Sequence, residues 1–457
     1  MSTSEELLPG TRRALLHRLA VGQAQGRAPS LVGAVVRGGR TVWCDSRSML
    51  DAHRPDGDVQ YRIGSITKSF VAVLVMRLVD EGVVGLDDAL ERHLPGTVAG
   101  HVTVRQLLSH TSGLTSETPV PWWERTPGSL RPAVADILSE SPAKHDPGSR
   151  FHYSNPGFAL LGALVERVRG AGWYEVLRAE VLAPLGMDRT TVLPEAPHAG
   201  GFAVHPWADV MLPEPLEDTG VMGPAGQLWS TVADLGRFAV FLTGGDERVL
   251  SGAALAAMRS PATAPENAEW TSGYGLGLQV KRDGDRSLFG HGGSMPGFVA
   301  GLWICEADDV AAIVLANATS GVPVSSLAAE LIGLVAELEP RIPEPWRPLE
   351  TVPEPELLAL TGPWYWGAAP FALRLRAERG LELVPLGLSG RAARFRAEPD
   401  GTWTGLDGYY AGETLCVVRG ADGLVSHLDI GSFVLTRGPY APGDVVPGGV
   451  DDAGWRV

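Results

Sequence analysis

YRIGSITKSF, residues 61–70, contains one of only three lysines in the chain, and this lysine, Lys68, follows Ser65 by three positions. The apolar residues that come next recur at the spacing of one helical face: Val71, Leu74, Val75, Leu78 and Val79. This periodicity predicts a helix with Ser65 at or near its N-terminus. One helical turn can bring the lysine amine beside the serine hydroxyl. Since a buried lysine can lose its proton near neutral pH, the pair could act as nucleophile and base.

A simpler interpretation is that Ser65 caps the helix while Lys68 extends its stem toward water. The same spacing occurs in Ser141-Pro-Ala-Lys144, which runs into HDPGS, a loop signal, instead of a long apolar helix. The spacing alone therefore does not establish a catalytic pair.

Composition narrows the classes of protein. With 457 residues, 44% apolar and 20% charged, the chain is a globular protein with at least two folding units. A formal charge of −15 and the lack of Lys/Arg runs argue against a nucleic-acid partner. The three cysteines lack C-x-x-C spacing and the histidines lack H-E-x-x-H spacing, so we expect no metal site and no cofactor.

Targeting signals are not evident in the sequence. The first 26 residues carry acidic residues where a signal peptide needs positive charge, and no stretch offers about 18 uninterrupted apolar residues. We therefore expect a cytoplasmic protein without membrane association.

The order of predicted elements suggests a sheet built from both ends of residues 1–340. A helix over residues 4–24 precedes strands at 31–39 and 41–44, and two further strands begin at Phe298 and Val310. A long, helix-rich segment lies between them. We expect an α/β (α+β) domain with an antiparallel sheet flanked by helices, an inserted helical region, and an active site between the two.

A second domain follows a proline-rich linker. A helix over 326–338 is followed by repeated prolines, and residues 341–356 read as the linker because proline disfavours both helix and sheet. Residues 357–457 contain short alternating segments such as FALRLRA and TLCVVR, separated by glycines. This pattern is typical of a small antiparallel barrel or sandwich.

Two more motifs carry polar groups suited to chemistry. In HYSNPGF, Tyr153 could relay a proton and Asn155 could hold a substrate and the lysine, although a capped helix with an exposed aromatic would look the same. His291-Gly292-Gly293 comes at the end of a strand-like run, where glycines allow a peptide-like ligand to approach the backbone. A flexible hairpin turn is the alternative for this motif.

In this order, S-x-x-K, Y-x-N and H-G-G resemble the serine beta-lactamase and penicillin-binding-protein superfamily, most closely its class C beta-lactamase-like hydrolases. The stretches LLSHTSGL (107–114), GPAGQLWSTVADLGRF (223–238) and GYGLGLQV (273–280) share the resemblance, which covers about residues 5–340. The C-terminal segment resembles the lipocalin-like barrel appended to many such hydrolases. A G-x-S-x-G nucleophile elbow, the mark of a different hydrolase class, does not occur.

The resemblance implies roles for individual residues. Ser65 would be the acylated nucleophile and Lys68 its base, Tyr153 the acid/base toward the second substrate, and Asn155 a substrate-binding residue. The oxyanion hole would use the backbone N–H of Ser65 and one near Ser294.

The resemblance also marks a departure from the classical pattern. His291 replaces the lysine of the K-T-G triad, with Gly292 and Gly293 as the rest, so a group that titrates near neutrality stands where a permanent cation would grip a carboxylate. This argues against strong beta-lactamase activity. Arg437, near the chain's end, could grip a substrate carboxylate or be a surface arginine, and Trp122 could line an acyl pocket or only pack.

These residues predict acyl transfer through a serine ester, with water or an amine as second nucleophile. Our preferred reaction is release and head-to-tail cyclisation of a nonribosomal peptide with a D-residue, as in penicillin-binding-type thioesterases, with a carrier protein presenting the peptidyl thioester. A stand-alone esterase or a D-stereospecific peptidase of the D-Ala-D-Ala carboxypeptidase type is the alternative. A non-catalytic binding relative is the second alternative.

Overall fold

The computed structural model describes residues 6–50, 55–119, 122–263, 271–343, 345–349, 353–377, 380–387, 390–441 and 444–446. The chain divides into two compact units, residues 1–341 and 342–457. Each unit has its own hydrophobic core and is described by itself.

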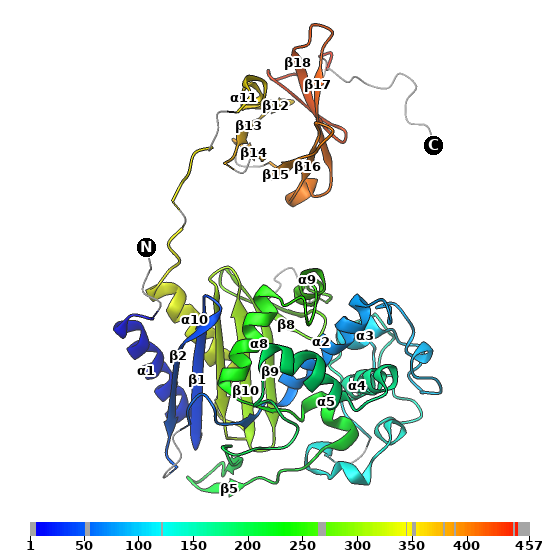
Figure 1. The fold of residues 1–457 in the computed structure, drawn as a ribbon, viewed down its shortest axis with the longest axis vertical. Coiled ribbons are helices and arrows are strands. Elements are labelled where there is room, and N and C mark those ends of the chain that lie inside the picture. Colours follow the sequence, from blue (N-terminus) through cyan, green and yellow to red (C-terminus); the bar gives the residue numbers. More distant parts are fainter. Residues whose placement is uncertain are drawn as a thin grey trace. The chain divides into compact units, whose positions relative to one another are not determined.

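The first unit is built on a seven-stranded antiparallel sheet (Figure 1). Its strands, in spatial order, are β2 (Arg40–Ser48), β1 (Ser30–Arg37), β11 (Val310–Ala316), β10 (Phe298–Cys305), β9 (Arg286–Met295), β8 (Gln279–Asp283) and β7 (Ser272–Tyr274). Strands from both ends of the unit pair within the sheet, where β1 lies beside β11 with Leu31 opposite Ala316. The sheet predicted from the two ends of the sequence is therefore confirmed.

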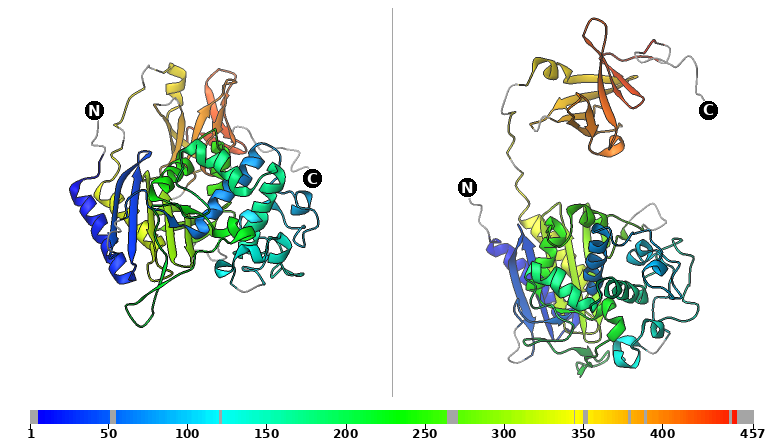
Figure 2. Two further views of the ribbon diagram at one scale, coloured as in Figure 1. Left: turned by 60° about the horizontal axis from the view of Figure 1, so that its bottom comes forward. Right: turned by 45° about the vertical axis from the view of Figure 1, so that its right-hand side comes forward.

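Helices cover both faces of this sheet (Figure 2). Helices α1 (Pro9–Gly26) and α10 (Val324–Leu338) pack on one face, with α1 against β1 and β2 and α10 against β10 and β11. Helix α8 (Val232–Gly244) packs against β1 and β11 from the other side. Because both faces are covered, β11 is buried along its whole length and reads as a continuous apolar run.

The inserted segment forms a helical region beside the sheet. Its centre is α2 (Thr67–Asp80), which is buried over most of its length and follows a single 3₁₀ turn, Gly64–Ile66. Around α2 lie α3 (Val104–Leu108), α4 (Asn155–Arg169), α5 (Trp173–Leu177), α6 (Ala183–Leu185), α7 (Gly223–Gly226) and α9 (Gly252–Arg259). Two short ladders complete the unit: β3 (Tyr61–Arg62) with β6 (Trp229–Ser230), and β4 (Phe202–Val204) with β5 (Met211–Pro213).

The second unit is a closed eight-stranded antiparallel barrel that follows α11 (Pro355–Leu360). Its strands are β12 (Gly362–Trp366), β13 (Ala369–Leu375), β14 (Leu381–Pro385), β15 (Ala393–Ala397), β16 (Trp403–Gly405), β17 (Thr414–Arg419), β18 (Val425–Ile430) and β19 (Phe433–Thr436). Tyr365 of β12 pairs with Thr436 of β19 and closes the ring. Alternate residues point inward, among them the fully buried Trp364 and Phe395, so the barrel predicted from the alternating pattern is confirmed.

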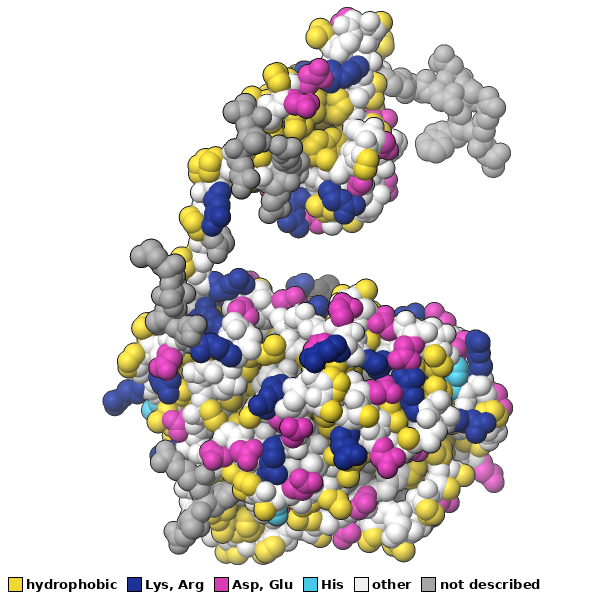
Figure 3. Space-filling model, viewed as in Figure 1, with side chains coloured by type: hydrophobic (Ala, Val, Ile, Leu, Met, Phe, Trp, Pro, Cys, Tyr) yellow, Lys and Arg dark blue, Asp and Glu magenta, His cyan; other side chains and the backbone are white. Residues whose placement is uncertain are grey.

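Two features are relevant to nucleic-acid and membrane partners: the surface charge and the apolar character of the helices. On the face drawn in Figure 3, basic and acidic side chains of the first unit are interspersed, without a continuous basic field. Within the described ranges, no helix combines the length and apolar character that a membrane crossing needs.

Candidate active site

Ser65 and Lys68 meet at the start of α2. Ser65 is half-buried in the 3₁₀ turn, whereas the side chain of Lys68 is fully buried. Lys68 Nζ donates hydrogen bonds to Ser65 Oγ at 3.0 Å and to the Ala225 carbonyl at 2.5 Å. The Ser65 side chain does not cap α2, whose N-cap position is Ile66.

The environment of Lys68 favours its neutral form. Burial lowers the pKa of the Lys68 ammonium to about 7, while the nearby carboxylates of Glu117 and Glu124 act in the opposite direction. A large share of Lys68 is therefore a free amine at neutral pH. An amine at hydrogen-bond distance from a hydroxyl can accept its proton.

Close packing of α7 fixes the carbonyl that holds Lys68. The Leu228 N–H donates to Thr67 Oγ1 at 3.1 Å, which ties the segment after α7 to the first turn of α2. Gly162 of α4 lies against Pro224 with no room for a Cβ atom. Helix α4 and the stretch 223–238 therefore position the Ala225 carbonyl through these contacts.

Tyr153 lies beside the pair at the entrance to α4. Its phenol hydrogen-bonds the Ser65 side chain, and its ring centroid is 4.9 Å from Lys68 Nζ. Burial raises the pKa of the Tyr153 phenol above its ordinary value, and the bond to Ser65 only partly offsets this. Tyr153 is thus a neutral O–H group at neutral pH and can donate a proton.

Asn155, the first residue of α4, is buried and points to a carboxylate. Its Nδ2 donates to Glu117 Oε1 at 2.8 Å, and Trp123 Nε1 donates to Glu117 Oε2 at 2.7 Å. A backbone bond from Asn155 N to the Ser116 carbonyl at 3.0 Å joins the two segments. Glu117 was not predicted, because it belongs to no recognisable motif, whereas Trp123, in PWWER, was considered with Trp122 as a residue that lines an acyl pocket or only packs.

Strand β9 passes directly under the Ser65 turn. Gly64 has φ +53°, and a Cβ atom there would lie 2.5 Å from the Ser294 backbone nitrogen. A Cβ on Gly293 would collide with the Ile63 carbonyl. The glycines therefore let the turn lie on the strand, which brings the backbone of Ser65 close to that of Ser294.

His291-Gly292-Gly293 lies inside β9, not at the end of a strand, and the expectation for this motif is corrected here. Glycines have low strand propensity, so the sequence pattern ended the strand too early. Gly292 faces the opposite layer, where a Cβ would meet Ser325 Oγ of α10 at 2.8 Å. The motif is thus held on both sides of the sheet and is not a flexible turn.

His291 is a neutral side chain. It is 1% exposed, and burial lowers the pKa of its imidazole to about 3. Its Nδ1 lies 2.5 Å from the Gly292 carbonyl, which can only accept, and its Nε2 lies 2.9 Å from Tyr274 Oη. These contacts assign the proton to Nδ1 and make Tyr274 the donor to Nε2. The expectation that His291 titrates near neutrality is therefore wrong, because it ignored burial.

His110, in the stretch 107–114, is a neighbour that the motif analysis missed. Its ring lies 4.1 Å from the Tyr153 ring between centroids, and its Nδ1 accepts the Ser154 N–H at 3.0 Å. Burial lowers the pKa of His110 well below its ordinary value. The neutral His110 ring therefore packs against the Tyr153 ring.

Two predicted residues have other surroundings. Trp122 is 55% exposed, with the Arg125 guanidinium 4.4 Å from its ring, while the adjacent Trp123 is the buried one. Arg437 belongs to the barrel unit, where its guanidinium lies 4.0 Å from the Trp364 ring and donates to the carbonyls of Thr361 and Pro363. These contacts give Arg437 a structural role, and its part in substrate binding stays a prediction, as does that of Trp122.

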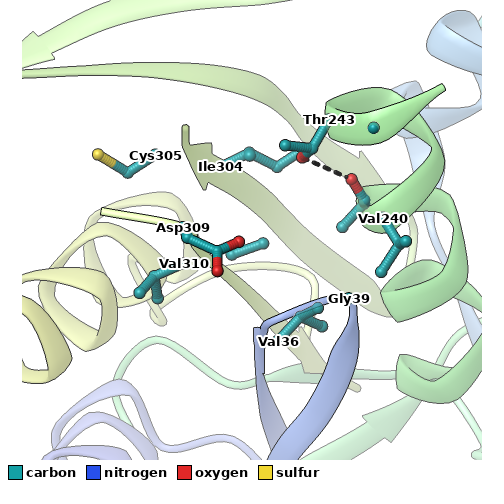
Figure 4. Close-up of a pocket in the computed structure, with 11 residues that line it drawn as sticks. Val36, Gly39, Val240, Thr243, Ile304, Cys305, Asp309 and Val310 are labelled. Atoms are coloured by element: carbon teal, nitrogen blue, oxygen red, sulfur yellow. Dashed lines mark hydrogen bonds between the residues drawn. The ribbon is translucent and has the colours of Figure 1, made fainter. Parts of the chain in front are cut away.

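Features away from this site include a cavity but no metal centre among the described residues. In the residues that the structure describes, no group of three or more His, Cys, Asp or Glu could hold a metal ion. A separate cavity of about 150 Å³ lies between α8 and the ends of β10 and β11 (Figure 4). Its lining is mostly apolar, for example Val36, Val240 and Val310, and includes none of the candidate site residues.

Comparison with known proteins shows the family of this chain. The family model described as Beta-lactamase matches residues 16–337. The chain belongs to the beta-lactamase family. Within it, the chain groups with the beta-lactamase-like and penicillin-binding-protein-like serine hydrolases. A second family model, a domain of unknown function (DUF7586), matches residues 353–437 of the barrel unit.

Several relatives of this beta-lactamase-family chain are informative. Penicillin-binding protein 4 of Amycolatopsis lactamdurans is 32% identical over 64% of this chain and 80% of its own length. A D-stereospecific amidohydrolase from Streptomyces sp. matches with a TM-score of 0.58 and 26% identity, over 72% of this chain and 99% of its own. The octameric penicillin-binding protein homologue from Pyrococcus abyssi, at 23% identity, has the same fold with a TM-score of 0.64 over 93% of this chain and 99% of its own.

Proposed function

We propose that this protein transfers an acyl group through an ester on Ser65, with Lys68 as the base and Tyr153 as the acid. The observation that carries the proposal is the buried Lys68 amine, 3.0 Å from the Ser65 hydroxyl. The pKa of Lys68, about 7, suits a general base at neutral pH. An exposed lysine would be protonated and could not take this role.

The first half-reaction follows from these groups. Neutral Lys68 takes the proton of Ser65 Oγ as this oxygen forms a bond to the acyl carbon. The backbone N–H groups of Ser65 and Ser294 donate hydrogen bonds that stabilise the negative charge on the carbonyl oxygen. The bond to the leaving group then breaks. The leaving group takes the phenolic proton of Tyr153, which is restored from the Lys68 ammonium.

The second half-reaction reverses these proton transfers. Water or an amine attacks the ester carbon and gives up a proton through Tyr153 and Lys68, and the C–O bond to Ser65 breaks. The products are an acid or an amide and the free hydroxyl. The substrate class that we propose is an ester, thioester or amide of a D-configured acyl group, supported by the similarity to a D-stereospecific amidohydrolase.

Cyclisation of a nonribosomal peptide is the second candidate. Here the peptide's own amine attacks the Ser65 ester after transfer from a carrier-bound thioester. The arrangement of a hydrolase unit followed by a barrel unit, which penicillin-binding-type thioesterases share, supports this candidate.

Mass spectrometry of protein and product tests both candidates. Wild type and Ser65→Ala would be incubated with a peptidyl thioester that ends in a D-residue and with the epimer that ends in the L-residue. We expect an adduct of the acyl mass on wild type alone, formed faster from the D-compound. A linear acid as product supports hydrolysis, and a product lighter by one water supports cyclisation. No adduct from this thioester or from simple esters would contradict the proposal.

A further inference from the structure

The side chain of Asn155, the proposed substrate-binding residue, is oriented by a carboxylate. Its side-chain nitrogen is committed to Glu117, at 2.8 Å. An amide has its donors on the nitrogen and its acceptor on the oxygen, so a bond from Nδ2 to Glu117 turns Oδ1 the other way. Asn155 therefore offers a substrate an acceptor, next to the carboxylate that orients it.

Glu117 itself is accessible, and the two side chains that donate hydrogen bonds to it are neutral. It is exposed, and each of its two oxygens accepts one hydrogen bond from a neutral donor, Asn155 or Trp123. Within the described part of the chain, no Lys, Arg or His side chain forms an ion pair with it. A carboxylate has about four acceptor sites, so Glu117 can accept further hydrogen bonds.

The site also contains a neutral imidazole and a second carboxylate, and the two cations that act on that carboxylate, Arg62 and Lys68, are buried. His291 is neutral and its Nδ1 proton is used by the Gly292 carbonyl. Glu124 adds a second carboxylate, which acts electrostatically on Lys68 together with Glu117. A substrate carboxylate would be repelled here, whereas a group with several N–H donors and a positive charge would be favoured.

We propose that Glu117 and the Asn155 Oδ1 atom bind a protonated primary amine carried by the acyl substrate. This inference rests on the proposed function and adds a substrate class to it. The amine could be the α-ammonium of a D-aminoacyl group or the N-terminal ammonium of a longer peptide that folds back onto the site. Both sources present the same –NH₃⁺ group. They differ in the distance between this group and the scissile carbon.

Two matched pairs of substrates distinguish these sources. The first pair is a D-phenylalanyl thioester with a free or an acetylated α-amine, and the second is a pentapeptidyl thioester ending in D-phenylalanine with a free or an acetylated N-terminus. Acetylation removes the charge and keeps the scissile bond. At pH 6.5, we expect kcat/KM for the free amine to exceed that for the acetylated form by about tenfold or more in one of the two pairs.

Glu117→Gln tests the residue. Glutamine can still accept the Asn155 Nδ2–H bond through Oε1 but lacks the charge, so the free-to-acetylated ratio should fall toward one. Glu124→Gln is the matched control: it removes a similar charge near Lys68, but its carboxylate is bound to Trp122 Nε1 at 2.8 Å and not to Asn155. That variant should lower the ratio much less than Glu117→Gln does, because Glu124 does not contact Asn155.

Binding to the Ser65→Ala protein, measured by calorimetry, gives the same comparison without turnover. This covers the case in which Glu117→Gln loses activity for another reason. Equal rates for free and acetylated substrates in wild type, or an unchanged ratio in Glu117→Gln, would overturn the amine site while an adduct on Ser65 still supports the proposed function. Absence of the adduct would instead overturn the function.

Discussion

Two serine–lysine pairs with identical spacing occur in this chain, Ser65 with Lys68 and Ser141 with Lys144. The first pair begins a buried helix, and its lysine is fully buried between the serine hydroxyl and the Ala225 carbonyl. In the second pair both side chains are exposed, in a loop whose backbone is held by a bond from Lys144 N to the Gly113 carbonyl at 2.7 Å. The two pairs share the same spacing and differ in the burial of the lysine. The spacing alone therefore does not make a serine reactive.

The largest expected difference between the two pairs is the effect on kcat of removing the serine hydroxyl of each pair. Ser65→Ala is expected to lower kcat for a D-configured ester by at least about 10³-fold, because no other group can accept the acyl chain. Ser141→Ala should leave kcat unchanged, since its side chain is exposed and outside the site. Steady-state kinetics on both variants checks this. Equal kinetics in wild type and Ser65→Ala would contradict it.

The lysines should differ in both activity and stability. Lys68→Met is expected to lower kcat by about 10²–10⁴-fold, the usual contribution of a general base. Because burying an ammonium is unfavourable, the same change should maintain or raise the thermal midpoint. Lys144→Met should alter neither quantity. A Lys68→Met enzyme with wild-type kcat would exclude this lysine as the base.

The pH dependence should report the buried lysine. As the proposed base, Lys68 can accept a proton only in its neutral form, so kcat/KM for an N-acetylated D-ester should rise with pH and level off above about 7. The nearby Glu124 carboxylate favours the charged form of Lys68, so Glu124→Gln should move the inflection to lower pH. A profile that is flat between pH 5.5 and 8.5 would speak against a titrating base.

Glycines near the two pairs offer a smaller, structural test. Gly64 has φ +53° and lies against the Ser294 backbone, so Gly64→Ala should lower the free energy of unfolding by about 2–4 kcal/mol and slow acylation. Gly148 has φ +80°, with only Gln106 Nε2 nearby at 3.5 Å. Gly148→Ala should cost about 1 kcal/mol and keep acylation intact. Denaturant unfolding of the two variants measures the difference, and equal losses would contradict the close approach of the turn to β9.

The sequence allowed good prediction of local order. The apolar spacing after Lys68 matches α2, the runs at Phe298 and Val310 are β10 and β11, and alternation revealed the barrel. These features are periodic within one segment, so they can be read without tertiary structure. The order of the three motifs likewise allowed the family to be predicted.

What could not be predicted depends on contacts between distant segments. Glu117 becomes part of the site only because residues 114–117 pair with those preceding α4, and the Ala225 carbonyl reaches Lys68 only through the packing of α7. The neutrality of His291 likewise results from burial and from Tyr274, 17 positions earlier. No local pattern encodes such contacts.

Site-specific trapping tests the central claim most directly. Wild-type protein would be treated with a serine-directed phosphonate carrying a D-configured side chain, digested, and analysed by peptide mass spectrometry for label on Ser65 and on Ser141. We expect label on Ser65 alone, and its loss in the Lys68→Met variant. Equal labelling of the two serines, or labelling of Ser65 that does not depend on Lys68, would contradict the conclusion that the buried lysine activates this serine.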